Sequence, residues 1–134
     1  MRSGACSCGR VRYQSEGEIL FALICHCRDC QRASGSGGVP VMGVEKSGFE
    51  IQGQTHSYAV TGGSGLRAVR HFCPECGSLL FGMPEVAPKL VTIYAGSLDD
   101  PSLFQPTVAI FVRSRPAWMV PGCIAVEYDT LPEN

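Results

Sequence analysis

Seven of the eight cysteines in this chain fall into three local groups whose spacing suits metal binding. The groups are a C-x-C pair (Cys6, Cys8), a C-x-C-x-x-C triplet (Cys25, Cys27, Cys30) and a C-x-x-C pair (Cys73, Cys76). Zinc prefers a tetrahedral shell, and a tight turn that carries two thiolates supplies half of it. The two pairs, brought together by the fold, therefore predict one closed site with a structural zinc.

The turns of the two pairs have the residues that such a site needs. In "CPECG", Pro74 stiffens the loop between the ligands, and Gly77 suits the positive φ that knuckle turns often require. Gly9 stands at the same place after Cys8. The spacing is a specific zinc signal.

The triplet has no fourth cysteine nearby in the sequence. Three protein ligands and one exchangeable position make the arrangement of catalytic zinc, where water or substrate is the fourth ligand. Cys25, Cys27 and Cys30 are therefore candidate catalytic residues as well as metal ligands, and we expect two zinc ions per chain. Other interpretations stay open: Cys123 or a histidine completes the shell, or the triplet is a redox or vestigial site.

A zinc ribbon is another way to pair the cysteines. It would join Cys27 and Cys30 to the "CPEC" pair and leave Cys25 with the N-terminal pair. Because this disperses the tight triplet, we favour the first partition.

Two histidines lie near these ligands. His26 alternates with Cys25 and Cys27, so in extended backbone we expect it to point away from them. His71 precedes Cys73 by two residues, which in a strand places both on one face. We expect His71 either to support the ligands or simply to be buried.

Residues around the triplet are candidates for substrate binding. Zinc with three thiolates carries a formal charge of −1, and Arg28 and Arg32 are placed to offset it or to hold an anionic substrate. Ser34 and Gly35 belong to "RASGSGG", where a substrate can approach the backbone closely. The alternatives are solvated surface arginines and a mobile loop.

The elements that must position these residues are short. Segments of strand length, bounded mostly by Gly, Pro, Ser or Asp, occur at 11–13, 19–25, 39–44, 49–51, 56–60, 68–72, 78–82, 90–96, 108–112 and 124–128. Only 27–34 and 97–104 suggest helical turns. We expect a loop tip at 61–65 and a frayed end at 130–134. The pattern predicts a mainly β single domain over residues 1–134, with zinc-bound cysteine knuckles and short helical turns.

Composition limits the partners. A net charge of −1 gives no electrostatic footprint for nucleic acid, and no apolar run approaches the roughly 18 to 20 residues that span a bilayer. The N-terminus has no apolar core of a signal peptide, so we expect a cytoplasmic protein. In a reducing compartment, metal binding explains eight cysteines better than the alternative, a secreted disulfide framework.

Five signatures occur in order along the chain: "CSCGRVRY", "CHCRDCQRASGS", "RHFCPECGSLLF", "AGSLDDPS" and "RSRPAW". With these the sequence resembles the glutathione-dependent formaldehyde-activating enzyme family, which also includes centromere-protein-V-like proteins. The resemblance implies a β-tent fold, a structural zinc on the first and last cysteine pairs, and a catalytic zinc on the triplet. The activity that it implies is carbon–sulfur lyase chemistry: reversible union of formaldehyde, or another small electrophile, with the thiol of glutathione or a similar small thiol.

One position departs from the family pattern. Many members carry a histidine in the strand before the late Arg and Trp signature, where this chain has Ala109. If that histidine helps to form the pocket, the substrate here differs. The alternative function is a non-catalytic binding or structural module whose zinc only stabilises the fold.

Overall fold

The computed structural model describes residues 1–61 and 65–132 and is mainly β, as predicted. The strands are β1 (Arg2–Ala5), β2 (Arg12–Ser15), β3 (Ile19–Cys25), β4 (Val39–Glu45), β5 (Phe49–Gln52), β6 (His56–Thr61), β7 (Arg67–Phe72), β8 (Leu79–Pro84), β9 (Leu90–Tyr94), β10 (Val108–Ile110) and β11 (Val126–Glu127). The helical elements are α1 (Arg28–Ser34) and the 3-10 turns η1 (Ala95–Ser97), η2 (Pro101–Leu103) and η3 (Val112–Ser114). Within the described ranges, no helix has the length and apolarity to cross a membrane. The centre of the predicted loop tip, 62–64, and the chain end, 133–134, lie outside the described residues.

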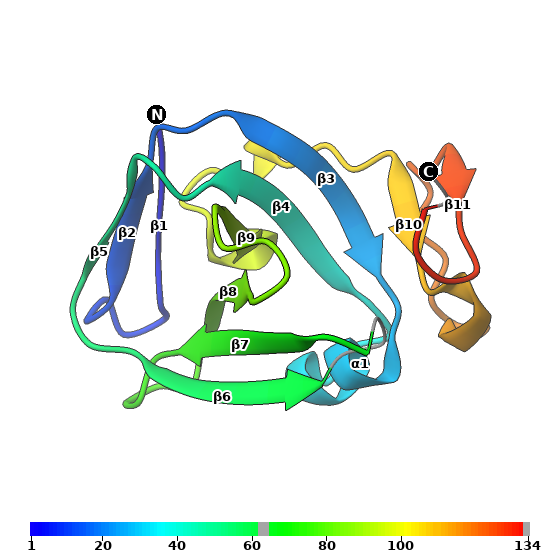
Figure 1. Cartoon of the computed structure of the whole chain (residues 1–134), viewed down its shortest axis with the longest axis horizontal. Helices are drawn as coiled ribbons and strands as arrows, with labels where there is room; N and C mark the ends of the chain where they lie inside the picture. Colours follow the sequence, from blue (N-terminus) through cyan, green and yellow to red (C-terminus); the bar gives the residue numbers. More distant parts are fainter. Residues whose placement is uncertain (62–64, 133–134) are drawn as a thin grey trace.

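The strands form two sheets (Figure 1). The smaller has the order β1-β2-β5, and the larger has the order β11-β10-β3-β4-β9-β8-β7-β6. All pairs are antiparallel except those of β10, which runs parallel to both β3 and β11. In Figure 1 the small sheet stands on the side of the N-terminus, and β10 and β11 lie on the opposite side, near the C-terminus.

The predicted pattern of strands needs correction at several places. Strand β1 was not predicted, because "RSGA" lacks β-branched and aromatic residues; it is a strand because it pairs with β2 along its whole length. The segment predicted at 108–112 ends as a strand at Ile110, since Phe111 adopts a left-handed φ of 54° and a 3-10 turn follows. The segment predicted at 124–128 is a strand only over Val126–Glu127.

The two faces of the large sheet have different surroundings: one packs into the main core, and the other lines a cavity. On one face, buried side chains of β4 and β9 such as Met42 and Ile93 join the main core, which also contains Tyr13 of the small sheet. The Phe49 ring lies 5.5 Å from that of Tyr13 and 5.1 Å from that of Phe81, so aromatic contacts tie the sheets together. Side chains of a strand alternate between faces, so Val41 on β4 faces the opposite way, into a cavity.

Candidate metal centres

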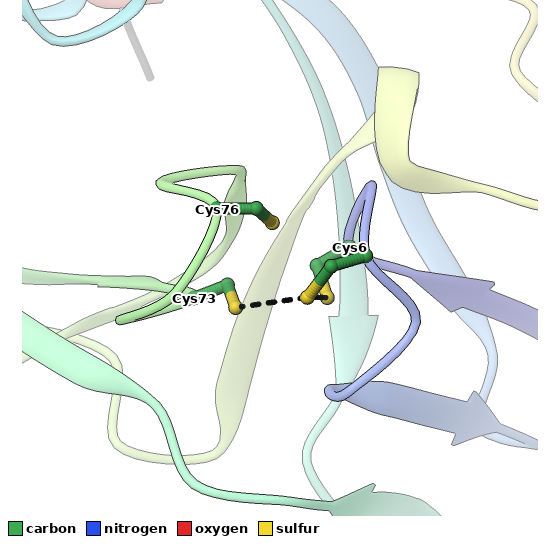
Figure 2. A group of neighbouring side chains, drawn as sticks. Cys6, Cys73 and Cys76 are labelled. Atoms are coloured by element: carbon green, nitrogen blue, oxygen red, sulfur yellow. Dashed lines mark hydrogen bonds between the residues drawn. The ribbon is translucent and has the colours of Figure 1, made fainter.

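Four cysteines from the two ends of the predicted closed site come together. The Sγ atoms of Cys6, Cys8, Cys73 and Cys76 all lie within 4.8 Å of one another. The Sγ of Cys8 is 3.5 Å from that of Cys6 and 3.7 Å from that of Cys73. A tetrahedral zinc with Zn–S distances of about 2.3 Å places its sulfurs about 3.8 Å apart. The cluster therefore fits zinc, and Figure 2 shows the side chains of Cys6, Cys73 and Cys76 gathered around one point.

The two turns that carry these cysteines have the same backbone geometry. The N–H of Gly9 donates to the carbonyl of Cys6 over 3.1 Å, and the N–H of Gly77 donates to the carbonyl of Cys73 over 2.9 Å. Both glycines have positive φ, 80° and 75°, which confirms the role predicted for them. Ser78 joins the two turns, because its Oγ accepts from the N–H of Ser7 at 3.0 Å. The same hydroxyl lies 3.2 Å from the Sγ of Cys76 and helps to lower the pKa of that thiol to about 5.

The triplet lies where β3 passes into α1. Cys25 is the last residue of β3, Cys27 is the N-cap of α1, and Cys30 belongs to the first turn of that helix. Their buried Sγ atoms all lie within 4.8 Å of one another, and no fourth His, Cys, Asp or Glu of the described residues joins the cluster. The structure thus separates the triplet from Cys73 and Cys76, which a zinc ribbon would have joined to it.

The triplet favours a thiolate. The Sγ of Cys27 accepts the N–H of Cys30 at 3.3 Å. Hydrogen bonding with the thiols of Cys25 and Cys30 lowers the pKa of Cys27 to about 2 and raises that of Cys25. Buried thiolates are soft ligands, so this donor set fits zinc with one coordination position left over.

Arg70 on β7 completes the surroundings of the triplet. Its Nη2 donates to the Sγ of Cys30 at 3.7 Å, and its side chain is buried. Burial opposes the charge of Arg70, but Tyr94 and Cys30 outweigh burial and raise its pKa. Burial also raises the pKa of Tyr94 to about 12, against the effect of Arg70. Neither residue was predicted to belong to the site; an arginine at the centre of the apolar-flanked "AVRHF" strand was the one signal in the sequence.

The four predicted substrate-binding residues lie elsewhere. Arg28, Arg32, Ser34 and Gly35 are all exposed, and none lines the cavity at the triplet. Arg28 donates to Oε1 of Gln31, Ser34 donates to the carbonyl of Cys30, and Gly35 ends the helix with a φ of 71°. Three of them thus have contacts that shape α1. Their part in substrate binding stays a prediction, while the cation that contacts the triplet is Arg70.

Neither histidine joins a metal cluster within the described residues. His26 is fully buried and donates from Nδ1 to the carbonyl of Gly37 at 2.8 Å, as expected for a side chain that points away from its neighbouring cysteines. The Nδ1 of His71 lies 2.9 Å from the Oγ1 of Thr55, and its ring stacks on Phe81 at 4.7 Å. These contacts give both histidines structural surroundings.

A cavity of about 640 Å³ opens onto the triplet. Its wall comes mostly from aliphatic side chains of the large sheet, including Leu23, Val41, Val60, Val108 and Ile110, with Leu131 of the segment after β11. Ala109 does not line it, because this fully buried residue faces the opposite way from its neighbours. The exposed Cys123 belongs neither to the wall nor to a described metal cluster.

Fold and site together define a class: a small, mainly β protein with one closed cysteine cluster and one that faces a cavity. Residues 1–114 match the family described as glutathione-dependent formaldehyde-activating enzyme, and the chain belongs to that family. A Halomonas elongata protein named "Putative glutathione-dependent formaldehyde-activating enzyme" is 26% identical over 122 residues, which cover 87% of this chain and 78% of that protein. A crystal structure of a Rhodobacter sphaeroides protein is similar with a TM-score of 0.57 at 23% identity, covering 72% of this chain and 87% of that one. The similarity to this crystal structure shows a shared fold and nothing further.

Proposed function

We propose that this protein is a zinc-dependent enzyme of carbon–sulfur lyase type. It catalyses the reversible addition of formaldehyde, or a related small electrophile, to the thiol of glutathione or a similar small thiol. The observation that carries the proposal is the buried triplet, in which three sulfurs face a cavity and no fourth ligand of the described residues joins them. The name of the family supports the two substrates.

The residues have separate roles. Cys25, Cys27 and Cys30 hold the catalytic zinc, and the four-cysteine cluster holds a structural one. When bound at the triplet, zinc lowers the pKa of a thiol or polarises an aldehyde oxygen. Arg70 offsets the negative charge that three thiolates leave on the zinc site, through its contact with Cys30.

The reaction balances without an oxidant. The thiol sulfur attacks the carbonyl carbon, a C–S bond forms, the C=O double bond becomes a C–O single bond, and the thiol proton ends on that oxygen. Tyr94 lines the cavity together with the three cysteines, and a tyrosine hydroxyl is protonated at neutral pH. It can therefore donate a hydrogen bond to an oxygen that gains negative charge in the cavity. Where substrates fill the cavity next to the triplet, its apolar walls reduce the contact with water and strengthen this interaction.

The thiols also bear on the location of the protein. Cysteine ligands bind metal only in the reduced state, and reducing conditions are those of the cytoplasm. We therefore place this enzyme there, with small molecules as its partners and neither nucleic acid nor membrane among them.

NMR-monitored exchange between formaldehyde and glutathione tests the proposal. The zinc-loaded protein is expected to speed the exchange, whereas Cys27→Ser is expected to abolish the acceleration. The Cys123→Ser variant is the matched control, because it removes an exposed cysteine outside both clusters. An exchange rate that the protein leaves unchanged at substantial concentration contradicts the assignment to formaldehyde.

A further inference from the structure

The cavity at the triplet is far larger than formaldehyde. Its volume of about 640 Å³ lies in the range of pockets that hold whole drug-sized ligands. A molecule the size of water occupies about 30 Å³, so a one-carbon aldehyde fills a small part of the space. Most of the wall would then stay in contact with water.

The wall is mostly apolar, and its polar side chains among the described residues are the cysteines of the triplet, Arg70, and the hydroxyl-bearing Thr92, Tyr94, Thr107 and Tyr128. Near the triplet it is made by residues such as Val41 and Ile110, and the mouth has exposed apolar side chains, among them Phe21, Val86 and Leu131. Large apolar surfaces in contact with water are unfavourable, so such a wall indicates an apolar ligand.

The scarcity of charged side chains in the wall also favours an apolar ligand. Arg70 is the one charged side chain of the described residues that lines the cavity, and its guanidinium already contacts Cys30 and Tyr94. Glutathione carries two carboxylates and an ammonium at neutral pH. None of these charges finds a free side chain of opposite charge among the described residues of the cavity, and burying a charge without such a partner is costly. The peptide must therefore reach the triplet with its thiol and keep its charged ends at the mouth, in water.

Resting on the proposed function, we infer that the electrophile of this enzyme is an aldehyde that carries a hydrocarbon chain of several carbons. The chain lies along the apolar wall, and the carbonyl group lies at the triplet beside Tyr94. The bonds change as they do with formaldehyde: a C–S bond forms, the carbonyl double bond becomes single, and the thiol proton passes to the oxygen. The product is a 1-hydroxyalkyl thioether.

Two measurements on the zinc-loaded protein test this inference. In the first, calorimetry follows binding of 1-propanol, 1-butanol and 1-hexanol, which have the chain of the aldehyde and cannot react. Each added methylene is expected to tighten binding roughly fourfold. In the second, glutathione reacts with formaldehyde, butanal or hexanal, and the acceleration over the uncatalysed rate is compared. The acceleration is expected to rise, and the half-saturating concentration to fall, with chain length.

Two variants locate the binding site. Val108→Thr and Val60→Thr keep the size of the side chain and put a hydroxyl into the wall, on strands β10 and β6. Each is expected to weaken binding of 1-hexanol about tenfold, since a buried hydroxyl without a partner is unfavourable. Val120→Thr makes the same change at an exposed position outside the cavity and is expected to bind like the wild type. Using two sites guards against one variant that fails to fold.

The outcomes separate the two ideas. If the protein accelerates the reaction of glutathione with formaldehyde, the acceleration is no larger for longer aldehydes and 1-hexanol does not bind, the inference is overturned and the proposed function stays intact. Binding of 1-hexanol with no acceleration of any aldehyde overturns the proposed function. A stable dimer that becomes monomeric in Val60→Thr or Val108→Thr shows that a second copy of the chain covers the wall, which also overturns the inference.

Discussion

The guanidinium of Arg70 donates a hydrogen bond from Nη2 to the Sγ of Cys30 at 3.7 Å, and both side chains are buried. Hydrogen bonding with Cys25 lowers the pKa of Cys30, but hydrogen bonding with Cys27 and burial outweigh it and raise that pKa to about 11. Arg70 acts to lower the pKa of both Cys27 and Cys30, because a buried cation near a sulfur favours the thiolate over the thiol. In the function proposed above, Arg70 thus balances the charge of the triplet and positions Cys30.

Replacing Arg70 by Gln is expected to lower the zinc affinity of the triplet by about tenfold to a hundredfold, because groups that contact metal ligands contribute on that scale. Competition against a chromophoric chelator measures the change. The matched control is Arg67→Gln on the same strand, whose side chain is exposed and lies 3.4 Å from Glu85. Equal zinc affinities in the two variants contradict the role assigned to Arg70.

The two cysteine clusters are expected to respond differently to loss of a ligand. Cys27→Ser should reduce the zinc content from two ions per chain to one and leave the chain folded, because the triplet lies beside a cavity. Elemental analysis gives the zinc content, and circular dichroism reports the fold. Unfolding of Cys27→Ser would support the alternative of a purely structural zinc.

Cys73→Ser should instead destabilise the whole chain. Cys73 is fully buried in the main core, and its cluster links the N-terminal turn to the turn after β7. Loss of a structural zinc ligand is expected to lower the free energy of unfolding by about several kcal/mol. That is a large part of the total stability of a domain of this size. Chemical denaturation with and without a zinc chelator measures it, and chelation should affect the wild type far more than this variant.

Tyr13 is expected to make stability fall at alkaline pH. It is buried, its hydroxyl lies 2.7 Å from the Oγ of Ser97, and burial raises its pKa from 10 to about 12. The folded state therefore keeps a proton that the unfolded state loses. Its contribution is complete below pH 10 and is lost as the pH rises from 10 through 12, with a slope of at most about 1.4 kcal/mol per pH unit.

Tyr13→Phe removes this titration. The variant should lose about 1 kcal/mol at neutral pH and show a shallower decline above pH 10, as measured by denaturation at each pH. Ser97 keeps a partner, since its hydroxyl also donates to the carbonyl of Tyr94 at 2.8 Å. Tyr58→Phe, at an exposed tyrosine on β6, is the control. Identical alkaline profiles for wild type and Tyr13→Phe would show that Tyr13 does not cause the decline.

Gly4→Ala should be destabilising because β1 passes close over Tyr13. A Cβ on Gly4 would lie 2.2 Å from the Tyr13 hydroxyl oxygen and 2.5 Å from the carbonyl oxygen of Ser97. Such overlap is expected to cost about 1 to 3 kcal/mol, measured as a lowered midpoint of thermal or chemical unfolding. Gly96→Ala is the control, since its Cβ would meet nothing within 4 Å. A Gly4→Ala variant as stable as Gly96→Ala would contradict the predicted close packing.

The local parts of this protein follow from its sequence alone. Cysteines two or three positions apart in Gly- and Pro-containing turns converge because the turn holds them together, whatever surrounds it. Strand positions such as 19–25 followed from runs of β-branched and aliphatic residues between turn residues. The mainly β class and the grouping of seven cysteines could therefore be predicted from residue types and spacing.

Which distant residues meet depends on the tertiary structure. Arg70 contacts Cys30 because β7 and the helix after β3 lie next to each other, and no local pattern encodes that contact. The register of β10 against β3 turns Val108 and Ile110 into the cavity and Ala109 away from it, so Ala109 is not part of the cavity wall. Because register and sheet order arise from contacts across the whole chain, the apolar wall and the arginine within it could be found only in the folded protein.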